Sequence, residues 1–294
     1  MSIELTRAKG TCGIDSYRKI LSYFREKPLV TVACLILLLI AMSAIFALWV
    51  APKDPYQMEI RSRLKPIGTP GFPLGTDSYG RDILSRVIWA GRTSLLAGVV
   101  PAFIAMSFGV LLGLLSGYWG GWFDRIVMAV VDIMLSFPFM LLAIALVAAL
   151  GPSLQNAMIA VIVATVPARI RLIRGETLSI KEASFIDAAR VLGYGDLRII
   201  FSEILPNVMA IAMTAMSMDI PLMISATAGL SFLGLGVQPP QADWGTMVSD
   251  GKNFIMIAPH VTLVPSAVLL IVTLCFAIIG DAVRVIFNPK ARDE

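Results

Sequence analysis

The chain has 294 residues, of which 57% are hydrophobic and only 15% are charged, and its mean hydropathy is +0.81. Soluble domains carry about 25% charged residues, whereas the apolar residues here come in blocks of about 20, the length of a bilayer-crossing helix. These features exclude a soluble enzyme, a disordered chain and a secreted disulfide scaffold. The net charge of +4 does not indicate nucleic-acid binding, because the charges lie between the apolar blocks and are explained more simply by orientation in a membrane.

Six apolar blocks predict an all-α integral membrane protein with six transmembrane helices. The first block is too long for the apolar core of a signal peptide, so we expect an uncleaved anchor. The fourth is the weakest, because Arg169, Arg171 and Arg174 follow it within two turns and must reach the membrane surface along their alkyl stems. The blocks cover residues 29–51, 93–117, 126–150, 154–173, 207–233 and 261–280, the last running on amphipathically toward Phe287.

Basic residues predict the orientation of these spans. With both termini in the cytoplasm, sixteen Lys and Arg residues lie on the inner side and eight on the outer side, as the excess of cytoplasmic positive charge requires. We therefore expect cytoplasmic tails at 1–28 and 288–294, a first anchor helix at 29–51, an extracytoplasmic connection at 52–92 and a core at 93–287.

The connection at 52–92 is predicted to hold a short helix that lies at the membrane surface. Thr76 or Asp77 is suited to cap it, and an apolar stripe (Ile83, Leu84, Val87 and Ile88) follows. A packed amphipathic helix with no function of its own is an equal alternative. The first half of the connection is broken by prolines, namely Pro52, Pro55, Pro66, Pro70 and Pro73.

The second span carries Gly109, Gly113 and Gly117. Spacing of four residues places all three on one face of a helix, where a neighbouring helix can approach closely. We interpret them as packing residues and not as a ligand site.

Two carboxylates lie within spans, and each precedes a proline. Asp132 comes before Pro138 in the third span, and Asp219 comes before Pro221 in the fifth. A charge at that depth costs about 2.5–3.5 kcal/mol on insertion scales, so both side chains are expected to face the bundle interior. They are candidates for lining a translocation pathway; the alternative is an aspartate satisfied by nearby backbone or hydroxyl groups. No basic partner is expected for them in any span.

Residues 174–207 form the most polar internal segment. It predicts two short helices, about 181–192 and 195–204, with Gly193 in the left-handed conformation that ends a helix. Pro206 is suited to the first turn of the next span. Asp187 stands beside two small residues, Ala188 and Ala189, which allow another protein to come close, with Arg190, Arg198 and Glu203 at the rim. This pattern favours docking to a soluble partner over an ordinary solvated loop.

The sequence has no recognisable catalytic machinery. A GxxxxGK[ST] phosphate loop is absent, and so are HExxH, CxxC and GxSxG motifs. The single histidine is His260, and the three cysteines (Cys12, Cys34 and Cys275) fit neither a disulfide framework nor a metal cluster. We therefore expect no catalytic residue, metal or bound cofactor in this chain. An intramembrane enzyme is disfavoured, because a serine–lysine pair would need a lysine within a span.

The polar segment resembles the EAA loop of ABC importer permeases. The residues that carry the resemblance are Asp187-Ala188-Ala189, followed after three residues by Gly193 and later by Leu205-Pro206. The family pattern is Glu-Ala-Ala, three residues, Gly, nine residues and Ile-x-Leu-Pro. Asp187 replaces the glutamate, and Glu203 stands at the isoleucine position. Four longer stretches resemble the second, C-type permease of dipeptide, oligopeptide, glutathione or nickel importers: LGTDSYGRDILSRVIWAGRTSL, SGYWGGWFDRIVMAVVDIMLSFP, GLSFLGLGVQPPQADWGTMVSDG and IGDAVRVIFNPK.

The resemblance implies a type I importer permease with six spans and cytoplasmic termini in the bacterial cytoplasmic membrane. It also implies a sister permease that completes the pore, two ATPase subunits that use ATP and Mg²⁺, and an extracytoplasmic solute-binding protein. The helix with Ala188 and Ala189 would sit in a groove of one ATPase, and Gly193 and Pro206 would bound the moving element. Within the outer loop at 236–260, residues around Gln238–Asp250, with Pro239, Pro240 and Trp244, are expected either to contact the binding protein or sister subunit, or to form a rigid packed turn.

A stand-alone channel or ion-driven carrier is the alternative function. It would need a charged or carbonyl-lined filter, or inverted repeats with broken helices. Neither is clear in the sequence. The identity of the solute is not specified by any motif.

Overall fold

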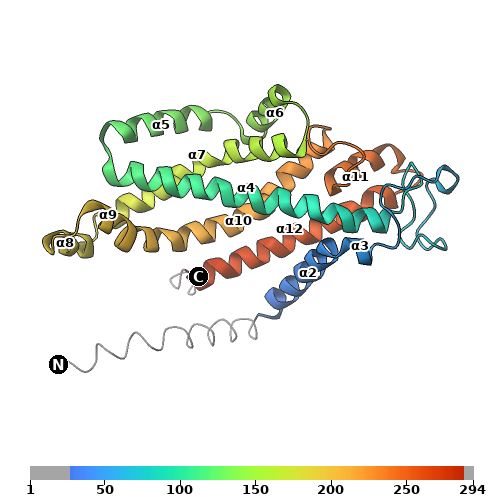
Figure 1. Cartoon of the computed structure of the whole chain (residues 1–294), viewed down its shortest axis with the longest axis horizontal. Helices are drawn as coiled ribbons and strands as arrows, with labels where there is room; N and C mark the ends of the chain where they lie inside the picture. Colours follow the sequence, from blue (N-terminus) through green and yellow to red (C-terminus); the bar gives the residue numbers. More distant parts are fainter. Residues whose placement is uncertain (1–26, 288–294) are drawn as a thin grey trace.

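Long helices dominate the computed structural model, which describes residues 27–287 (Figure 1). The predicted tails, apart from Lys27 and Pro28, lie outside the described residues, and so does Cys12. No strand occurs within 27–287, where only two isolated bridges form, both in the connection that follows the first helix. Five helices in this part of the chain are long and apolar enough to cross a membrane, or six if one bent pair counts as a span.

The predicted first span is divided into two helices. α2 covers Pro28–Ile45 and α3 covers Ala47–Val50, with Phe46 between them. The guanidinium of Arg92 donates hydrogen bonds to the carbonyls of Ala44 (2.6 Å) and Ile45 (2.7 Å). Helix-end carbonyls lack intrahelical partners, so Arg92 satisfies the end of α2 and fixes its break. The first span predicted at 29–51 therefore consists of two helices that meet at Phe46.

The predicted surface helix and the second span are one element. α4 runs over 37 residues, Ile83–Trp119, a length of about 55 Å at 1.5 Å per residue. Its N-cap is Asp82, which accepts a hydrogen bond from the Ser85 N–H (2.8 Å), and not Thr76 or Asp77 as predicted. The prediction of a separate surface helix failed because Arg86 was expected to face solvent. In the structure Arg86 is buried and pairs with Asp77.

The predicted third span at 126–150 is sharply bent. α5 (Gly121–Leu135) and α6 (Phe139–Leu150) meet at 92° across residues 136–138. Pro138 lacks an N–H and disfavours helical geometry at the residue before it, so one straight helix cannot form here. Pro138 is visible in the sequence, but the sequence analysis did not predict a bend of this size.

The fourth span is longer than predicted and the fifth continues an earlier helix. α7 covers Leu154–Lys181 and carries the three arginines inside a continuous helix. α8 (Ser184–Val191) follows it. A short helix, α9, then passes into a π-helix, η2, and directly into α10. Their bounds are Asp196–Arg198 for α9, Ile199–Ile204 for η2 and Leu205–Phe232 for α10.

The remaining elements complete the bundle. η1 (Ile60–Ser62) lies in the first connection, and α11 (Trp244–Gly251), η3 (Lys252–Phe254) and α12 (His260–Phe287) follow α10. α8 and α9 project from one end of the bundle, whereas the first connection and α11 lie at the other (Figure 1). The start of α2 packs on the last turns of α12 through Val30 and Ala282.

Three glycines of α4, namely Gly109, Gly113 and Gly117, lie against α7. A methyl group added at Gly109, Gly113 or Gly117 would come within 3 Å of Arg169, Ile170 and Thr177 respectively. Small residues also fill the core between α4, α7 and α10, which lets these helices approach closely. The buried alanines there are Ala102, Ala105, Ala157, Ala160, Ala164 and Ala226.

We predict that Gly113→Ala destabilises the protein by about 1–3 kcal/mol, the usual cost of overpacking a core. The added methyl group would lie 2.7 Å from the carbonyl oxygen of Ile170, which backbone motion alone can relieve. Gly175→Ala is the matched control, because Gly175 is helical and a methyl group there meets nothing within 4 Å. Thermal unfolding of the detergent-solubilised protein checks this. Equal melting temperatures for the two variants would contradict the packing role of Gly113.

Candidate functional site

A short helix at one end of the bundle holds the sequence that resembles the EAA loop. α8 ends in a Schellman arrangement: the Tyr194 N–H donates to the Ala189 carbonyl (3.0 Å) and the Gly193 N–H donates to the Arg190 carbonyl (2.9 Å). Gly193 has φ +79°, the left-handed conformation expected from the sequence. This turn sets the direction in which the chain leaves α8.

The two faces of α8 differ in burial. Ile186 and Ala189 are buried in a cluster with Ile199 and Ile204 of the π-helix, while Asp187 faces solvent. Ala188 and Arg190 are exposed as well. Ala189 already packs within its own chain. Only Ala188 of the two presents a small outward surface.

Apolar side chains surround this outward surface. Phe185, Val191 and Leu192 are all exposed, Val191 at 89% of its area. In a helix pair beyond the end of the long helices, adjacent exposed apolar residues indicate a protein contact site. The sequence motif directed attention to Asp187 and Ala188 but did not identify these three neighbours.

Polar contacts join α9 to the end of α4, and the end of α7 to the end of α4. The Tyr118 hydroxyl donates to Asp196 (2.6 Å), and the Lys181 ammonium donates to the Tyr118 carbonyl (2.5 Å). The guanidinium of Arg198 lies 3.8 Å from the ring centroid of Tyr194. The segment is therefore tied to the end of α4 through Asp196, and that end of α4 is in turn tied to α7 through Lys181.

Pro206 lies in the first turn of α10, as the sequence predicted, but the separate helix predicted before it is continuous with α10. Residues 196–232 form one continuous helical run, with Leu205 and Pro206 directly after the π-helix. Ile199, Ile200 and Ile204 are buried along it. The segment therefore has a left-handed turn at Gly193 and then continues as unbroken helix from Asp196 into α10.

Both predicted intramembrane aspartates have basic partners, which corrects the expectation of none. Asp219 of α10 lies 2.7 Å from the guanidinium of Arg169 on α7, and Asp132 of α5 pairs with Arg171. The Asp219 side chain is 3% exposed, whereas that of Asp132 is 61% exposed. These partners could have been sought among the arginines at the end of the fourth apolar block. In the sequence those arginines look like the edge of a span, whereas in the structure they lie within the continuous helix α7.

A third pair joins α7 to α5. Arg174 contacts Asp124 through two hydrogen bonds of 2.5 and 2.6 Å, and the Ser116 hydroxyl of α4 donates to the same carboxylate. Such two-point contacts fix orientation as well as distance. α7 is thus the helix to which the neighbouring helices are tied by charge.

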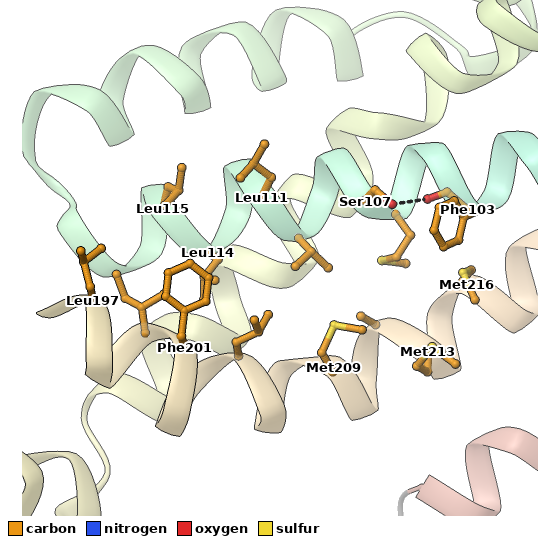
Figure 2. A pocket seen from close by; sticks show the side chains of 15 residues that line it. Phe103, Ser107, Leu111, Leu114, Leu115, Leu197, Phe201, Met209, Met213 and Met216 are labelled. Carbon is orange, nitrogen blue, oxygen red and sulfur yellow. Dashed lines mark hydrogen bonds between the residues drawn. The ribbon is translucent and has the colours of Figure 1, made fainter.

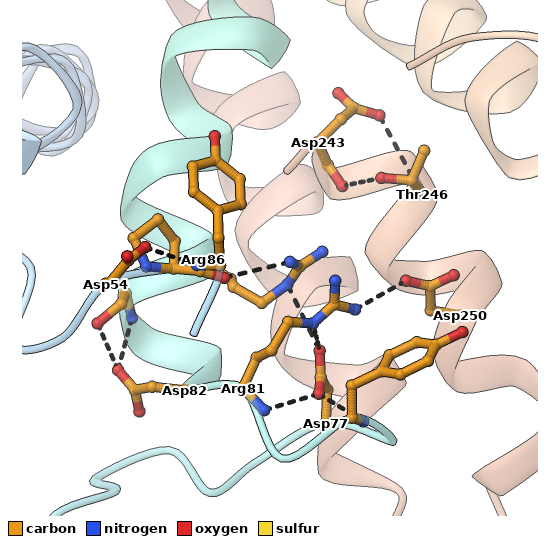
Figure 3. A network of polar contacts seen from close by, with 12 residues as sticks. Asp54, Asp77, Arg81, Asp82, Arg86, Asp243, Thr246 and Asp250 are labelled. Carbon is orange, nitrogen blue, oxygen red and sulfur yellow. Dashed lines mark hydrogen bonds and ion pairs between the residues drawn. The ribbon is translucent and has the colours of Figure 1, made fainter. Parts of the chain in front are cut away.

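The opposite end of the bundle contains a buried charge network that the sequence did not predict (Figure 3). Asp77 accepts hydrogen bonds from the Arg81 side chain (2.6 Å) and from the N–H groups of Tyr79 (2.8 Å) and Arg81 (2.9 Å). Arg86 lies 3.5 Å from the same carboxylate, and Arg81 reaches Asp250 of α11 at 3.4 Å. The network joins the first connection to α4 and α11. Burial raises the pKa of the Asp250 carboxyl, and the nearby Arg81 opposes that rise.

The outer loop is partly a packed turn. Trp244 is fully buried, and its indole N–H donates to the Val87 carbonyl of α4 (3.1 Å). Asp243 caps α11 and accepts a hydrogen bond from the Ser94 hydroxyl (2.6 Å). Trp244 is therefore not available to another protein. Between Gln238 and Asp250 the exposed residues are Gln238, Pro239, Pro240 and Gln241, which lie beside a cleft of about 310 Å³.

A second cavity, of about 470 Å³, lies between α4 and the start of α10 (Figure 2). Its lining is apolar except for Ser107, whose hydroxyl donates to the Phe103 carbonyl of its own helix (2.8 Å). With no free polar group, this cavity cannot orient a peptide or another polar solute.

Residues 109–293 match the family described as binding-protein-dependent transport system inner membrane component, and residues 17–66 match the N-terminal transmembrane domain of oligopeptide transport permease C. The chain belongs to this permease family. It is a multi-pass component of the bacterial inner membrane. The family resemblance given by the sequence is confirmed.

Two curated relatives illustrate the position of this permease in the family. The glutathione transport system permease protein GsiD of Pectobacterium atrosepticum is 40% identical over 270 residues, which cover 92% of this chain and 89% of that protein. The dipeptide transport system permease protein DppC of Haemophilus influenzae is 38% identical over 275 residues, which cover 92% and 93%. These relatives favour an ABC transport subunit over a stand-alone channel or ion-driven carrier.

The fold is shared with a solved ABC importer. An inward-facing form of the MetNI methionine ABC transporter has a chain that matches with a TM-score of 0.55 and 21% identity, covering 68% of this permease and 96% of that chain. At that identity the match supports the fold alone.

Proposed function

We propose that this permease forms half of the translocation pore of an ATP-driven, binding-protein-dependent importer. A sister permease supplies the other half, two ATPase subunits bind at the cytoplasmic face, and an extracytoplasmic solute-binding protein delivers the solute. ATP and Mg²⁺ are used by the ATPase subunits, and this chain hydrolyses nothing itself. The bundle has six spans, with the bent pair α5–α6 counted as one.

The solute is proposed to be a small peptide or a related compound, glutathione included. The names of the two relatives support this class, and the sequence also resembles permeases of oligopeptide and nickel importers. The apolar character of the cavity between α4 and α10 agrees with selection by the binding protein and not by a polar pocket of this chain at that position.

The single observation that carries the proposal is the outward surface of α8. Ala188 and the exposed Phe185, Val191 and Leu192 form a small apolar platform rimmed by Asp187 and Arg190. We propose that an ATPase subunit binds this platform, and that its closure on ATP moves α8 and the continuous π-helix–α10 run. The pore then opens outward by rigid-body alternating access.

The proposed sidedness follows from the same surface. If α8 is cytoplasmic, the start of α2 and the end of α12 lie toward the cytoplasm, in agreement with the charge count. The connection at 52–82 and α11 then face outward, and the exposed residues from Gln238 to Gln241 are the candidates for contacting the binding protein or the sister permease.

Reconstitution tests this function. The chain is expressed with the products of its neighbouring genes, purified through a tag on this permease, and placed in proteoliposomes with the binding protein. We expect a phosphate-loop ATPase to co-purify and uptake of labelled peptide to require ATP and every partner. Uptake by the chain alone, driven by an ion gradient, would contradict the proposal and support the carrier alternative.

A further inference from the structure

The Arg169–Asp219 pair occupies a junction of three helices. Arg169 of α7 faces Asp219 of α10 at 2.7 Å, and Gly109 of α4 lies so close that a methyl group there would come 2.5 Å from the Arg169 Cβ. The guanidinium side chain is 20% exposed. The packing glycine and the intramembrane carboxylate that the sequence singled out separately therefore meet at one arginine.

This pair is poorly suited to a purely stabilising role. Its charges are largely removed from water, and Arg169 Nε and Asp219 Oδ2 have no hydrogen-bond partner among the described residues. Burying an ion pair costs several kcal/mol per ion, and the attraction offsets this only when the remaining polar atoms are satisfied. An apolar contact of similar volume would serve stability as well. The pair is better suited to fixing how the two helices are placed relative to each other.

Arg169 and Asp219 lie at similar distances along their helices from the segment at 182–204. Arg169 lies 12 residues before the end of α7, about 18 Å, and Asp219 lies 14 residues after the start of α10, about 21 Å. Pro167 and Pro221 each lie two residues from the pair, on the side away from that segment. A proline inside a helix removes one backbone hydrogen bond and creates a point of bending.

We propose that Arg169 and Asp219 are positioning residues that clamp two arms into one lever. The arms are residues 169–181 of α7 and 205–219 of α10, and α8 with the π-helix joins their ends. Pro167 and Pro221 mark where the lever bends against the rest of the bundle. When α8 is displaced, both arms then move together, and the movement is transmitted to the middle of the bundle. This inference rests on the proposed function, because the displacement is supplied by the ATPase.

The test is the number of solute molecules imported per ATP hydrolysed by the reconstituted transporter. The double variant Arg169→Met/Asp219→Leu removes both charges and keeps apolar volume, so that folding is preserved. We expect normal assembly with the ATPase but a fall in solute per ATP of about fivefold or more, the lower end of coupling between distinct sites. The exchange Arg169→Asp/Asp219→Arg, which restores a pair, is expected to recover most of the ratio.

Arg171→Gln is the matched control. Arg171 lies two residues along the same helix and also pairs with an aspartate, but its side chain is about half exposed. We expect its ratio of solute to ATP to stay at the wild-type value. A wild-type ratio in the double variant, or an equal fall in the control, would overturn the clamp.

A second variant keeps the test decisive if the double variant fails to assemble. Asp219→Asn removes only the charge and keeps the shape of the side chain. Normal assembly with a lowered ratio supports the clamp, and an unchanged ratio contradicts it. A chain that binds no ATPase in any form overturns the proposed function and the clamp together, whereas an assembled transporter with unchanged ratios overturns the clamp alone.

Discussion

Replacing Asp77 with alanine is expected to destabilise the protein by about 3–5 kcal/mol, the cost of leaving a buried charge without its partner. Arg81 and Arg86, which both contact this carboxylate, are almost completely buried. Without Asp77, two guanidinium groups remain in the interior with only the partly exposed Asp250 nearby. The measurement is thermal unfolding in detergent, together with the yield of folded protein.

Two further variants separate the contributions at this site. Asp77→Asn keeps an acceptor for the N–H groups of Tyr79 and Arg81 but removes the charge, so its cost should be intermediate. Arg190→Ala breaks an exposed pair with Asp187 and should change the melting temperature little, because exposed ion pairs contribute about 0–1 kcal/mol. A melting temperature for Asp77→Ala equal to that of Arg190→Ala would contradict the structural role of the network.

Replacing Gly193 with valine is expected to uncouple ATP hydrolysis from transport. Gly193 has φ +79°, a conformation that costs other residues about 1–2 kcal/mol and a β-branched residue the most. A penalty of about 1.4 kcal/mol shifts the equilibrium between the native turn and its open form about tenfold toward the open form. The Schellman turn that directs the chain from α8 toward the π-helix then opens. In the reconstituted transporter, uptake should fall about tenfold, while the permease still assembles and its melting temperature falls by only a few degrees.

Gly193→Asn is the control for this prediction. Asparagine tolerates the left-handed conformation better than valine, and a Cβ at this position meets nothing within 4 Å, so size alone is harmless. We expect uptake close to the wild-type level for Asn and a large loss for Val. Normal uptake and normal stimulation of ATP hydrolysis by the loaded binding protein in the Val variant would count against a coupling role for this turn.

The sequence predicted most of the helical material because bilayer-length apolar blocks are a strong signal. It also predicted the left-handed Gly193, since the glycine follows a short amphipathic helix. It missed the continuity of α4 and the Arg169–Asp219 pair for one reason. From its sequence neighbours alone, an arginine is expected to face water. In the fold, however, Arg86 and Arg169 are held inside by carboxylates on other elements.

Two other differences have the same long-range origin. Ala188 and Ala189 are adjacent small residues, and burial of Ala189 in the cluster that contains Ile199 and Ile204 leaves Ala188 as the one that faces outward. Pro138 predicts an interruption, but the 92° bend depends on how α6 packs against α7. Local propensity therefore identified the elements, and tertiary contacts decided their faces and angles.

The most direct test of the account is the neighbour of α8 in the assembled transporter. Ala188→Cys, in a chain whose three native cysteines are replaced by serine, is treated with a thiol-reactive crosslinker in membranes and in intact cells. We predict a crosslink to an ATPase subunit, protection of the thiol from membrane-impermeant reagents added outside, and labelling of a Lys252→Cys control by those reagents. Labelling of the Ala188→Cys thiol from the outside, or the absence of any crosslink to the ATPase in an active complex, would contradict the account.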